Sequence, residues 1–275
     1  MTKKNTAGNI FTALTYIFLY APIVVLIVFS FNSTKSRTVW SGFTLNWYKE
    51  LFSDSLIMSS LQTTLMVSVL ASLIAAVIGT FAAIGFYSMK KQWRAPFLTV
   101  NNIPVINADI ITGVSLSLLF VSAGLFMGFE LGFGTLLIAH ISFDIPYVIL
   151  SVMPKLYQLD RNLFEAAQDL GCTWFQTIYK VVIPEIMPGI INGLLIAFTM
   201  SVDDFVISYF TAGSSVETLS MAIYAMTRRR ISPKINAIST LLFAVVLILL
   251  IIVNVREARQ QKANIKKQKM LKGSN

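Results

Sequence analysis

Four aspartates lie inside long apolar stretches of this sequence, and their type and position suggest chemistry most directly. They are Asp109, Asp144, Asp203 and Asp204. A charged side chain near the centre of a membrane helix costs about 2.5–3.5 kcal/mol on insertion scales, so such residues lie in a bundle interior or along a pathway. No lysine or arginine lies inside any of these stretches. Acids without an internal counter-ion favour a route for cations.

Each acid also has a structural interpretation. His140 and Asp144 are four residues apart and can pair on one helical face, which fits a structural contact as well as a functional one. One carboxylate of Asp203 and Asp204 can cap a helix break, although two adjacent acids without a counter-ion favour the pathway. Asp109 follows a helix-breaking stretch where backbone can line a cavity.

Six apolar segments must hold these residues. Of the 275 residues, 55% are hydrophobic and 13% are charged, whereas an ordinary soluble domain carries roughly 25% charge. We predict an all-α integral membrane protein with a cytoplasmic N-terminus (1–9), a transmembrane domain (10–255) and a basic cytoplasmic tail (256–275). The predicted spans are about residues 10–31, 59–86, 97–125, 135–153, 189–212 and 235–255.

Three details refine these spans. The first exceeds the roughly 7–15 apolar residues of a signal peptide and lacks a small-x-small cleavage site, so we expect it to be retained. Pro104, Asn107 and Asp109 interrupt the third span early. Between the first two spans, residues 32–58 contain several aromatic residues, and we expect a short interfacial helix with Trp47 and Leu51 on one face.

The distribution of basic residues predicts the orientation. Fifteen of the 22 lie in segments that share one side, seven of them in the tail, and seven lie on the other side. Both termini are therefore expected in the cytosol. The net charge of +9 is concentrated in the tail, which favours contact with lipid over nucleic acid. The run Arg228 to Arg230 falls on the outer side, against the rule, and the sequence does not explain it.

A polar stretch between the fourth and fifth spans, residues 155–188, carries helix-capping signals. Asp160 can serve as an N-cap, with Leu159 and Phe164 as a hydrophobic staple. A short helix is predicted from Arg161 to about Leu170. Gly171 then falls at the position where a left-handed residue ends a helix.

A second short helix is predicted to follow that glycine. Thr173 and Gln176 have the spacing of a capping box. Pro184 is expected to end this helix, because proline lacks an N–H and clashes with the preceding turn. The sequence therefore predicts a helix–turn–helix elbow on the cytoplasmic side.

The single cysteine of the chain, Cys172, excludes an intrachain disulfide, and no Cys/His cluster suggests a metal site.

The elbow resembles the EAA loop of bacterial ABC importer permeases. The resemblance rests on Glu165-Ala166-Ala167, Gly171 after three residues, and Val181-Val182-Ile183-Pro184 nine residues later. It implies the type I ABC importer permease fold, in which this elbow is a coupling helix that docks on a cytoplasmic ATPase. The residues it assigns to ATPase coupling are Glu165, Ala166, Ala167, Gly171, Ile183 and Pro184.

Four further passages resemble spermidine/putrescine permease subunits: residues 42–48, 107–111, 201–208 and 231–237. The resemblance implies alternating-access import of polyamines across the bacterial cytoplasmic membrane. It implies as partners a second permease subunit, an ATPase dimer and an extracytoplasmic substrate-binding protein. A flexible, linear polycation needs separated carboxylates with aromatic walls between them. The candidate pathway residues are Asp109, Asp144, Asp203, Asp204, Tyr147 and Tyr209.

Other functions remain open at this point. An ABC importer permease of the same kind can transport another substrate, such as iron. A membrane enzyme or channel outside the ABC class is a further alternative, although such a protein would not need the elbow. The chain has no G-x-x-x-x-G-K-[ST] motif. We therefore expect a transport permease rather than an enzyme, with no cofactor of its own and with ATP and Mg²⁺ bound by the partner ATPase.

Overall fold

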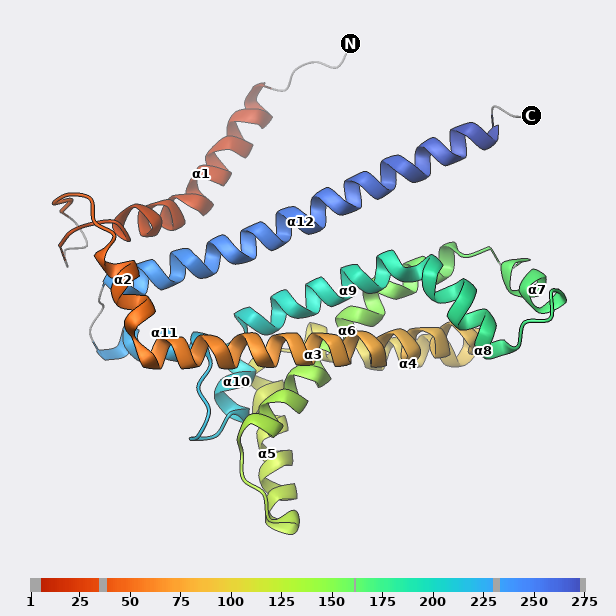
Figure 1. Ribbon diagram of the computed structural model, residues 1–275, viewed down its shortest axis with the longest axis horizontal. Coiled ribbons are helices and arrows are strands. Elements are labelled where there is room, and N and C mark those ends of the chain that lie inside the picture. Colours follow the sequence, from red (N-terminus) through yellow and green to blue (C-terminus); the bar gives the residue numbers. More distant parts are fainter. Residues whose placement is uncertain (1–5, 35–38, 161, 230–232, 273–275) are drawn as a thin grey trace. The chain divides into compact units, whose positions relative to one another are not determined.

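The computed structural model describes residues 6–34, 39–160, 162–229 and 233–272, with no account of side chains after Val255. Expectations for Arg161, Arg230 and the first five residues therefore lie outside the described part. The helices within these ranges are α1 (Thr6–Phe29), α2 (Asn46–Ser53), α3 (Ser55–Ser88), α4 (Lys91–Ile106), α5 (Asp109–Met127), α6 (Phe133–Gln158), α7 (Asn162–Asp169), α8 (Trp174–Thr177), the π-helix η1 (Ile178–Val182), α9 (Ile183–Asp203), α10 (Val206–Thr211), α11 (Leu219–Arg229) and α12 (Pro233–Lys272) (Figure 1).

Six helical segments are long and apolar enough to cross a membrane, which confirms the predicted all-α membrane fold. They are Ile10–Phe29, Ser55–Ser88, Asp109–Met127, Phe133–Gln158, Trp174–Asp203 and Pro233–Ile252. The chain divides into two compact units: residues 1–59 with 222–248, and residues 60–221 with 249–275. Every candidate pathway and coupling residue belongs to the second unit.

In the first unit, α2 is held by the segment that follows α1. The indole N–H of Trp47 donates to the carbonyl of Asn32 at 2.7 Å, and Phe31 stacks on Tyr48 with ring centroids 5.3 Å apart. Trp47 and Leu51 are both buried, so the expected apolar face of this helix packs inside the unit.

Helix α6 is the centre of the second unit, with α3 and α9 packed closely against it. The buried Val148 of α6 faces a glycine on each neighbour. A Cβ added at Gly79 of α3 would lie 2.8 Å from the Val148 side chain, and one added at Gly193 of α9 would lie 3.0 Å from its Cα. Gly189, one turn before Gly193, approaches the Ser151 carbonyl as closely. These glycines let the helix backbones meet.

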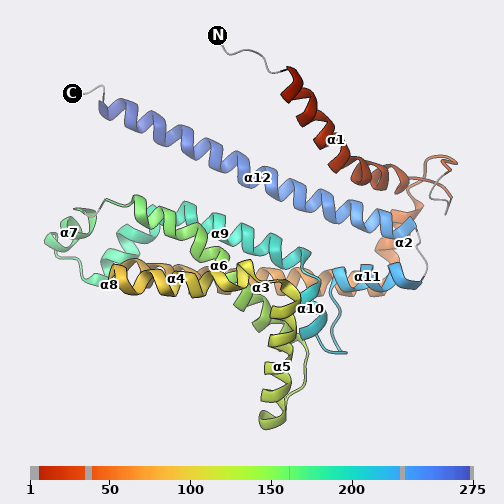
Figure 2. The ribbon, with the colours of Figure 1, turned by 180° about the vertical axis from the view of Figure 1, so that it is seen from behind.

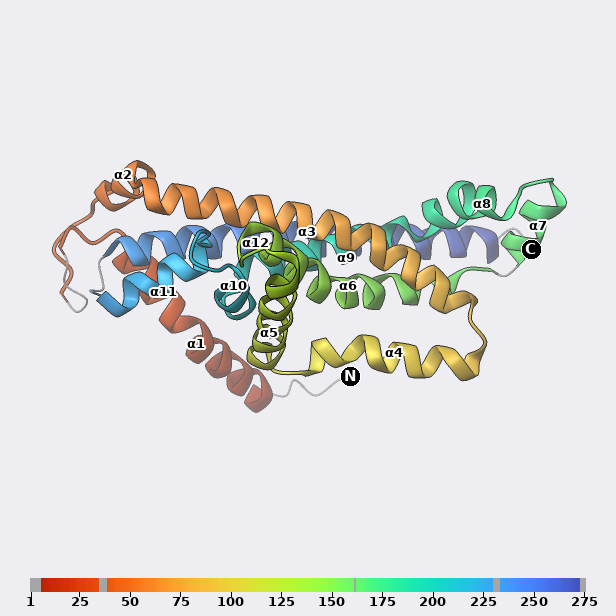
Figure 3. The same cartoon turned by 90° about the horizontal axis from the view of Figure 1, so that it is seen from below.

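The predicted interruption of the third span is confirmed. Asn107 ends α4 in an extended conformation (φ −72°, ψ 152°), and Asp109 opens α5. Figures 1 and 3 show that α4 runs alongside α6, whereas α5 turns away from that direction. The predicted span 97–125 is therefore two helices, of which only α5 is apolar enough to cross a membrane by itself.

The expectation that Pro184 ends the second elbow helix was wrong. Helix continues from Trp174 through η1 into α9, and Pro184 lies at the start of α9. A π-helical turn is wider than an α-helical one, so it can accommodate a proline ring that would clash with the carbonyl four residues earlier. The apolar helix consequently runs from Trp174 to Asp203, and the predicted span 189–212 is broken at residues 204–205, before α10.

The last helix also extends beyond the predicted span. The span was expected to end near residue 255, but α12 continues to Lys272. The backbone of the predicted tail is thus helical over most of its length.

Candidate functional site

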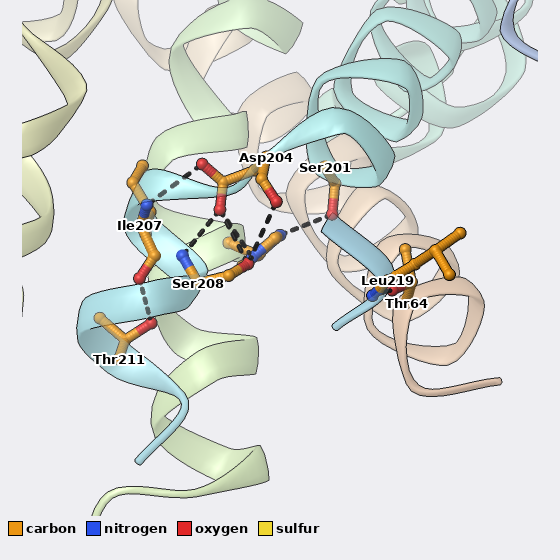
Figure 4. A network of polar contacts seen from close by, with 8 residues as sticks. Thr64, Ser201, Asp204, Ile207, Ser208, Thr211 and Leu219 are labelled. Carbon is orange, nitrogen blue, oxygen red and sulfur yellow. Dashed lines mark hydrogen bonds and ion pairs between the residues drawn. The ribbon is translucent and has the colours of Figure 1, made fainter. Parts of the chain in front are cut away.

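The break between α9 and α10 is organised by Asp204. Its carboxylate accepts hydrogen bonds from the backbone N–H groups of Ile207 (3.2 Å) and Ser208 (2.7 Å). The Ser208 hydroxyl donates to the same carboxylate at 2.8 Å (Figure 4). Asp204 therefore satisfies N–H groups that a helix start leaves unpaired, as an N-cap does.

His140 of α6 links the two sides of this break. Its Nδ1 lies 2.6 Å from the hydroxyl of Ser201 at the end of α9. Its Nε2 lies 3.0 Å from the hydroxyl of Ser208 on α10 and 3.6 Å from Oδ2 of Asp204. Both ring nitrogens are occupied in this way, so the pairing of His140 with Asp144 that the sequence allowed is not formed.

With Asp204 ionised and His140 neutral, one arrangement of hydrogens satisfies every bond of this cluster. The Ser208 hydroxyl gives its hydrogen to Asp204, so it accepts from the Nε2–H of His140. The Nδ1 atom of His140 is then an acceptor for the Ser201 hydroxyl. In this tautomer each side-chain hydrogen bond of the cluster has one donor and one acceptor. The cluster is complete without any further molecule.

Helix α10 is also held beyond the break. The hydroxyl of Thr135, in the first turn of α6, donates to the carbonyl of Thr211 at 2.8 Å. On the other side, Gly113 of α5 lies against Phe210 and Ile207, where an added Cβ would be 3.1 Å from the Phe210 ring. These contacts leave α10 little freedom to move independently of α5 and α6.

Asp144 contrasts with this cluster. It lies on α6, one turn beyond His140, and is fully buried. Within the described part of the chain, neither carboxylate oxygen of Asp144 has a hydrogen-bond partner. A buried carboxylate without a partner is costly, so this position needs a cation, a donor or a proton from outside the described residues.

Tyr147 lies on the same helix as Asp144, three residues further along, and also near Asp109 of α5. The Tyr147 phenol interacts electrostatically with both carboxylates. Phe143 of α6 meets two rings of the same helix edge to face. Its ring centroid lies 6.2 Å from that of Tyr147 and 5.6 Å from that of His140. Tyr147 is thus the predicted pathway residue that lies within electrostatic reach of both Asp109 and Asp144.

The two remaining pathway candidates lie on either side of the helix break. Asp203 is the last residue of α9 and is exposed, with Asp204 near enough to interact electrostatically. Tyr209 of α10 is also exposed, and its ring packs against Phe205 with centroids 5.5 Å apart. The adjacent aspartates therefore differ: Asp204 points into the cluster, and Asp203 does not cap α10.

The first helix of the elbow ends as its capping signals predict. Asp160 accepts a hydrogen bond from the Asn162 N–H at 3.0 Å. At the other end Gly171 adopts a left-handed φ of +85°. The N–H groups of Gly171 and Cys172 donate to the carbonyls of Gln168 (2.8 Å) and Ala167 (3.0 Å). This pair of bonds is the Schellman motif.

The second elbow helix begins with the predicted capping box. The Thr173 N–H donates to the Gln176 side chain at 3.0 Å, and the Gln176 N–H donates to the Thr173 hydroxyl at 3.4 Å. Figures 1, 2 and 3 show the elbow at the end of α6 and α9 away from α10.

The coupling candidates of the elbow divide by exposure. Ala167 is buried, Ile183 is half-buried, and the other four, Glu165, Ala166, Gly171 and Pro184, are exposed. The exposed residues are available to a partner, whereas Ala167 and Ile183 hold the elbow to its own helices.

Sequence reasoning missed several residues that shape this unit. Ser201 and Ser208 join the His140 cluster, but they are 61 and 68 residues from His140 and carry no local signal. Gly189 and Gly193, by contrast, do have a local sequence signal. They form a small-x-x-x-small pattern within an apolar helix, which is typical of close helix packing.

Comparisons with known proteins identify relatives that match most of the chain. The family model described as "Binding-protein-dependent transport system inner membrane component" matches residues 75–259. The putrescine transport system permease protein PotI of Escherichia coli (strain K12) is 38% identical over 256 residues, covering 92% of this chain and 91% of that protein. The spermidine/putrescine transport system permease protein PotC of the same strain is 35% identical over 252 residues, covering 91% and 93%.

Solved structures share the fold at lower identity. A chain of the bacterial alginate ABC transporter in complex with an alginate pentasaccharide-bound periplasmic protein superposes with a TM-score of 0.71 at 17% identity, covering 93% of this chain and 94% of that one. A chain of the MetNI methionine ABC transporter superposes with a TM-score of 0.58 at 18% identity, covering 80% of this chain and 99% of that one. The predicted resemblance is confirmed by the match over most of the chain, and this protein belongs to the family of binding-protein-dependent transport system inner membrane components.

Proposed function

We propose that this chain is a permease subunit of an ATP-driven importer that moves polyamines across the cytoplasmic membrane by alternating access. Similarity along nearly the whole chain to permeases named for putrescine and spermidine supports the cargo. The structural observation that carries the proposal is Asp144, a buried carboxylate in a membrane helix whose oxygens find no partner among the described residues. A substrate ammonium group would supply the missing partner.

The surroundings of Asp144 suit a flexible polycation. Polyamines carry ammonium groups separated by methylenes, so their site needs separated carboxylates with apolar or aromatic walls. Asp109 and Asp144 supply the charge, and Tyr147 with Phe143 supplies the wall. Contact between an ammonium and an aromatic face contributes about 0.5–2 kcal/mol. We assign Asp203 and Tyr209 to a second part of the route and Asp204 to holding the helix break.

The chain would work as one part of a larger machine. The proposed partners are a second permease of the PotB kind, an ATPase dimer of the PotA kind that binds ATP and Mg²⁺, and an extracytoplasmic binding protein of the PotD kind. The elbow is the proposed ATPase contact, because its well-capped helices expose Glu165, Ala166 and the turn at Gly171. Hydrolysis of ATP is assigned to the partner, so this chain is a transport component rather than an enzyme.

The proposed orientation has both termini in the cytosol, from the excess of basic residues on that side. Single cysteines at Lys90 and Lys269 should react with an impermeant thiol reagent only in opened cells, and cysteines at Glu130 and Glu217 should react in intact cells. The reverse labelling pattern would invert the topology without affecting the substrate assignment.

The decisive experiment measures uptake in a bacterial strain that lacks its own polyamine importers and expresses this chain with its partner subunits. Radiolabelled putrescine or spermidine should accumulate and should do so only with a hydrolysis-competent ATPase. Ferric iron serves as the competing cargo. Accumulation of iron instead of polyamine, with the assembled complex present in the membrane, would replace the polyamine assignment by the iron alternative.

Coupling through the elbow can be tested at its turn. Gly171→Val places a β-branched residue at a φ of +85°, which is strained for any residue with a Cβ. Space is not the limitation, because an added Cβ would meet nothing within 4 Å. We expect uptake to be lost while the protein still inserts in the membrane. Normal uptake by this variant would refute the role of the elbow in coupling.

A further inference from the structure

Arg94, in the first turn of α4, binds the end of a different helix. Its Nε donates to the carbonyl of Phe86 at 2.9 Å, and one terminal nitrogen donates to the carbonyls of Tyr87 and Met89, the latter at 3.0 Å. These carbonyls belong to the last turn of α3 and the residue after it, where backbone oxygens have no partner within the helix. A cation at this end also interacts favourably with the helix dipole.

The guanidinium of Arg94 also contacts two tyrosines on two helices. Its central carbon lies 5.4 Å from the ring centroid of Tyr87 on α3 and 5.7 Å from that of Tyr157 on α6. The two rings meet edge to face with centroids 6.0 Å apart. The geometry is that of a cation held at two aromatic rings, and it connects the end of α3 to the last turn of α6.

This contact lies next to the elbow. Tyr157 is the second-last residue of α6, and Leu159 follows directly before the capping residue Asp160. Leu159 belongs to one buried cluster with Ile84 of α3 and Ile178 of η1, and Tyr87 packs against that cluster. In Figure 3 the α3–α4 turn lies at the same end of the second unit as α7 and α8.

Two features separate Arg94 from other cations of this turn. Lys90 and Lys91 are exposed, whereas Arg94 is half-buried and donates three hydrogen bonds to backbone carbonyls. Its planar fork and stacking cannot be reproduced by lysine, which has the same charge but a compact ammonium. The arrangement therefore depends on an arginine, not merely on positive charge.

We propose that Arg94 is a positioning residue for energy coupling, which ties the α3–α4 turn to the base of the elbow so that both move together. This inference rests on the proposed function as an ATP-driven permease. A displacement of the elbow by its ATPase would act on the last turn of α6, and through Tyr157 and Arg94 it would act on α3 and α4. Without the link, ATP hydrolysis would continue while substrate movement falls behind.

The test measures polyamine transported per ATP hydrolysed by the complete complex in proteoliposomes. Arg94→Lys retains the charge and loses the fork. Tyr157→Leu removes one ring and leaves the hydrogen bonds of Arg94 in place. We expect each variant to lower transport per ATP by about tenfold, because Arg94→Lys loses the planar fork and Tyr157→Leu loses one aromatic ring of the same link. The double variant should be no worse than either single one, since both break the same link.

Lys91→Gln is the matched control, because it removes an exposed cation from the same turn and should leave transport per ATP unchanged. A purely structural role of Arg94 would lower the amount of assembled complex and leave transport per ATP unchanged. That result, or wild-type coupling in both variants, would overturn the proposal. If the wild-type complex moves no polyamine on hydrolysing ATP, the proposed function fails instead, so the two failures are distinguishable.

Discussion

Asp204 and Asp144 are both carboxylates in or beside membrane helices of the same unit, but their surroundings are opposite. The Asp204 side chain is 8% exposed and receives two backbone N–H groups and the Ser208 hydroxyl. Asp144 is 0% exposed, and neither of its oxygens is bonded within the described residues. Burial is therefore similar, and the supply of donors is what differs.

This difference separates a structural acid from a candidate binding acid. Donors built into the backbone of α10 stabilise the carboxylate of Asp204, so it needs nothing from outside the chain. Burial of the Asp144 carboxylate also costs free energy, but no hydrogen-bond donor among the described residues compensates for it. The proposed substrate supplies that compensation, because an imported cation is a partner that arrives and leaves.

The largest effect on transport is expected from Asp144→Asn. The substitution keeps the shape of the side chain and removes the charge that we assign to the substrate ammonium. Uptake should fall by about a hundredfold, since truncating one partner of a buried charge pair costs roughly 2–5 kcal/mol. The thermal stability of the purified complex should be unchanged or higher, because no bond within the described residues is lost.

Ser142→Ala is the control for this variant, because Ser142 is exposed on the same helix and bonds only to its own helix backbone. Wild-type uptake by Asp144→Asn would remove Asp144 from the pathway. A loss of assembled complex would instead assign it to contact with another subunit. Either outcome breaks the contrast with Asp204.

The adjacent aspartates provide the next test. Asp203→Asn should lower uptake by about tenfold, equivalent to roughly 1.4 kcal/mol, with normal amounts of complex, because Asp203 is exposed and does not cap α10. Asp204→Asn should destabilise the protein by about 1–2 kcal/mol, since the amide cannot accept all three donors of the cap. The measurements are uptake per assembled complex and the melting temperature of that complex. If Asp204→Asn instead forms a stable but inactive complex and Asp203→Asn is the destabilised variant, the assignment of Asp204 to the helix break and Asp203 to the route is contradicted.

A smaller effect is expected from Asp109→Asn. Asp109 is exposed at the start of α5 and interacts electrostatically with Tyr147. A solvated charge contributes about 0–1 kcal/mol to a pair, so uptake at low substrate concentration should fall by only a few-fold. The apparent affinity should weaken while the maximal rate stays close to that of the wild type. A change confined to the maximal rate would argue for a role in helix movement instead.

Much of the fold was predictable because its signals are local. The six apolar segments, the break before Asp109 and the caps at Asp160, Gly171 and Thr173 each depend on residues within a few positions of one another. Such signals survive in almost any tertiary context. Pro184 shows the limit of a local rule, because the π-helical turn before it relieves the clash that the rule assumes.

The sequence suggested candidate residues for the site but did not determine their arrangement. Sequence spacing allowed His140 to pair with Asp144 on one helical face, whereas Ser208 of α10 and Asp204 of the break before α10 lie against the imidazole. Contacts between residues more than sixty positions apart depend on helix packing, which periodicity does not determine. Adjacent side chains on a helix diverge by about 100°, which predicts different surroundings for Asp203 and Asp204, but this rule does not determine which of the two faces inward.

The smallest effect is expected from Ser201→Ala, at the edge of the Asp204 cluster. The Ser201 hydroxyl makes one bond in that cluster, to Nδ1 of His140 at 2.6 Å. Its loss should cost about 1 kcal/mol and leave uptake per complex unchanged, because Asp204 keeps its donors from α10. Ser208→Ala is the matched comparison and should lower the melting temperature further, since the Ser208 hydroxyl contacts both Asp204 and His140. If either alanine variant abolishes uptake in a stable complex, the cluster takes part in transport, and the division between a structural Asp204 and a substrate-binding Asp144 is wrong.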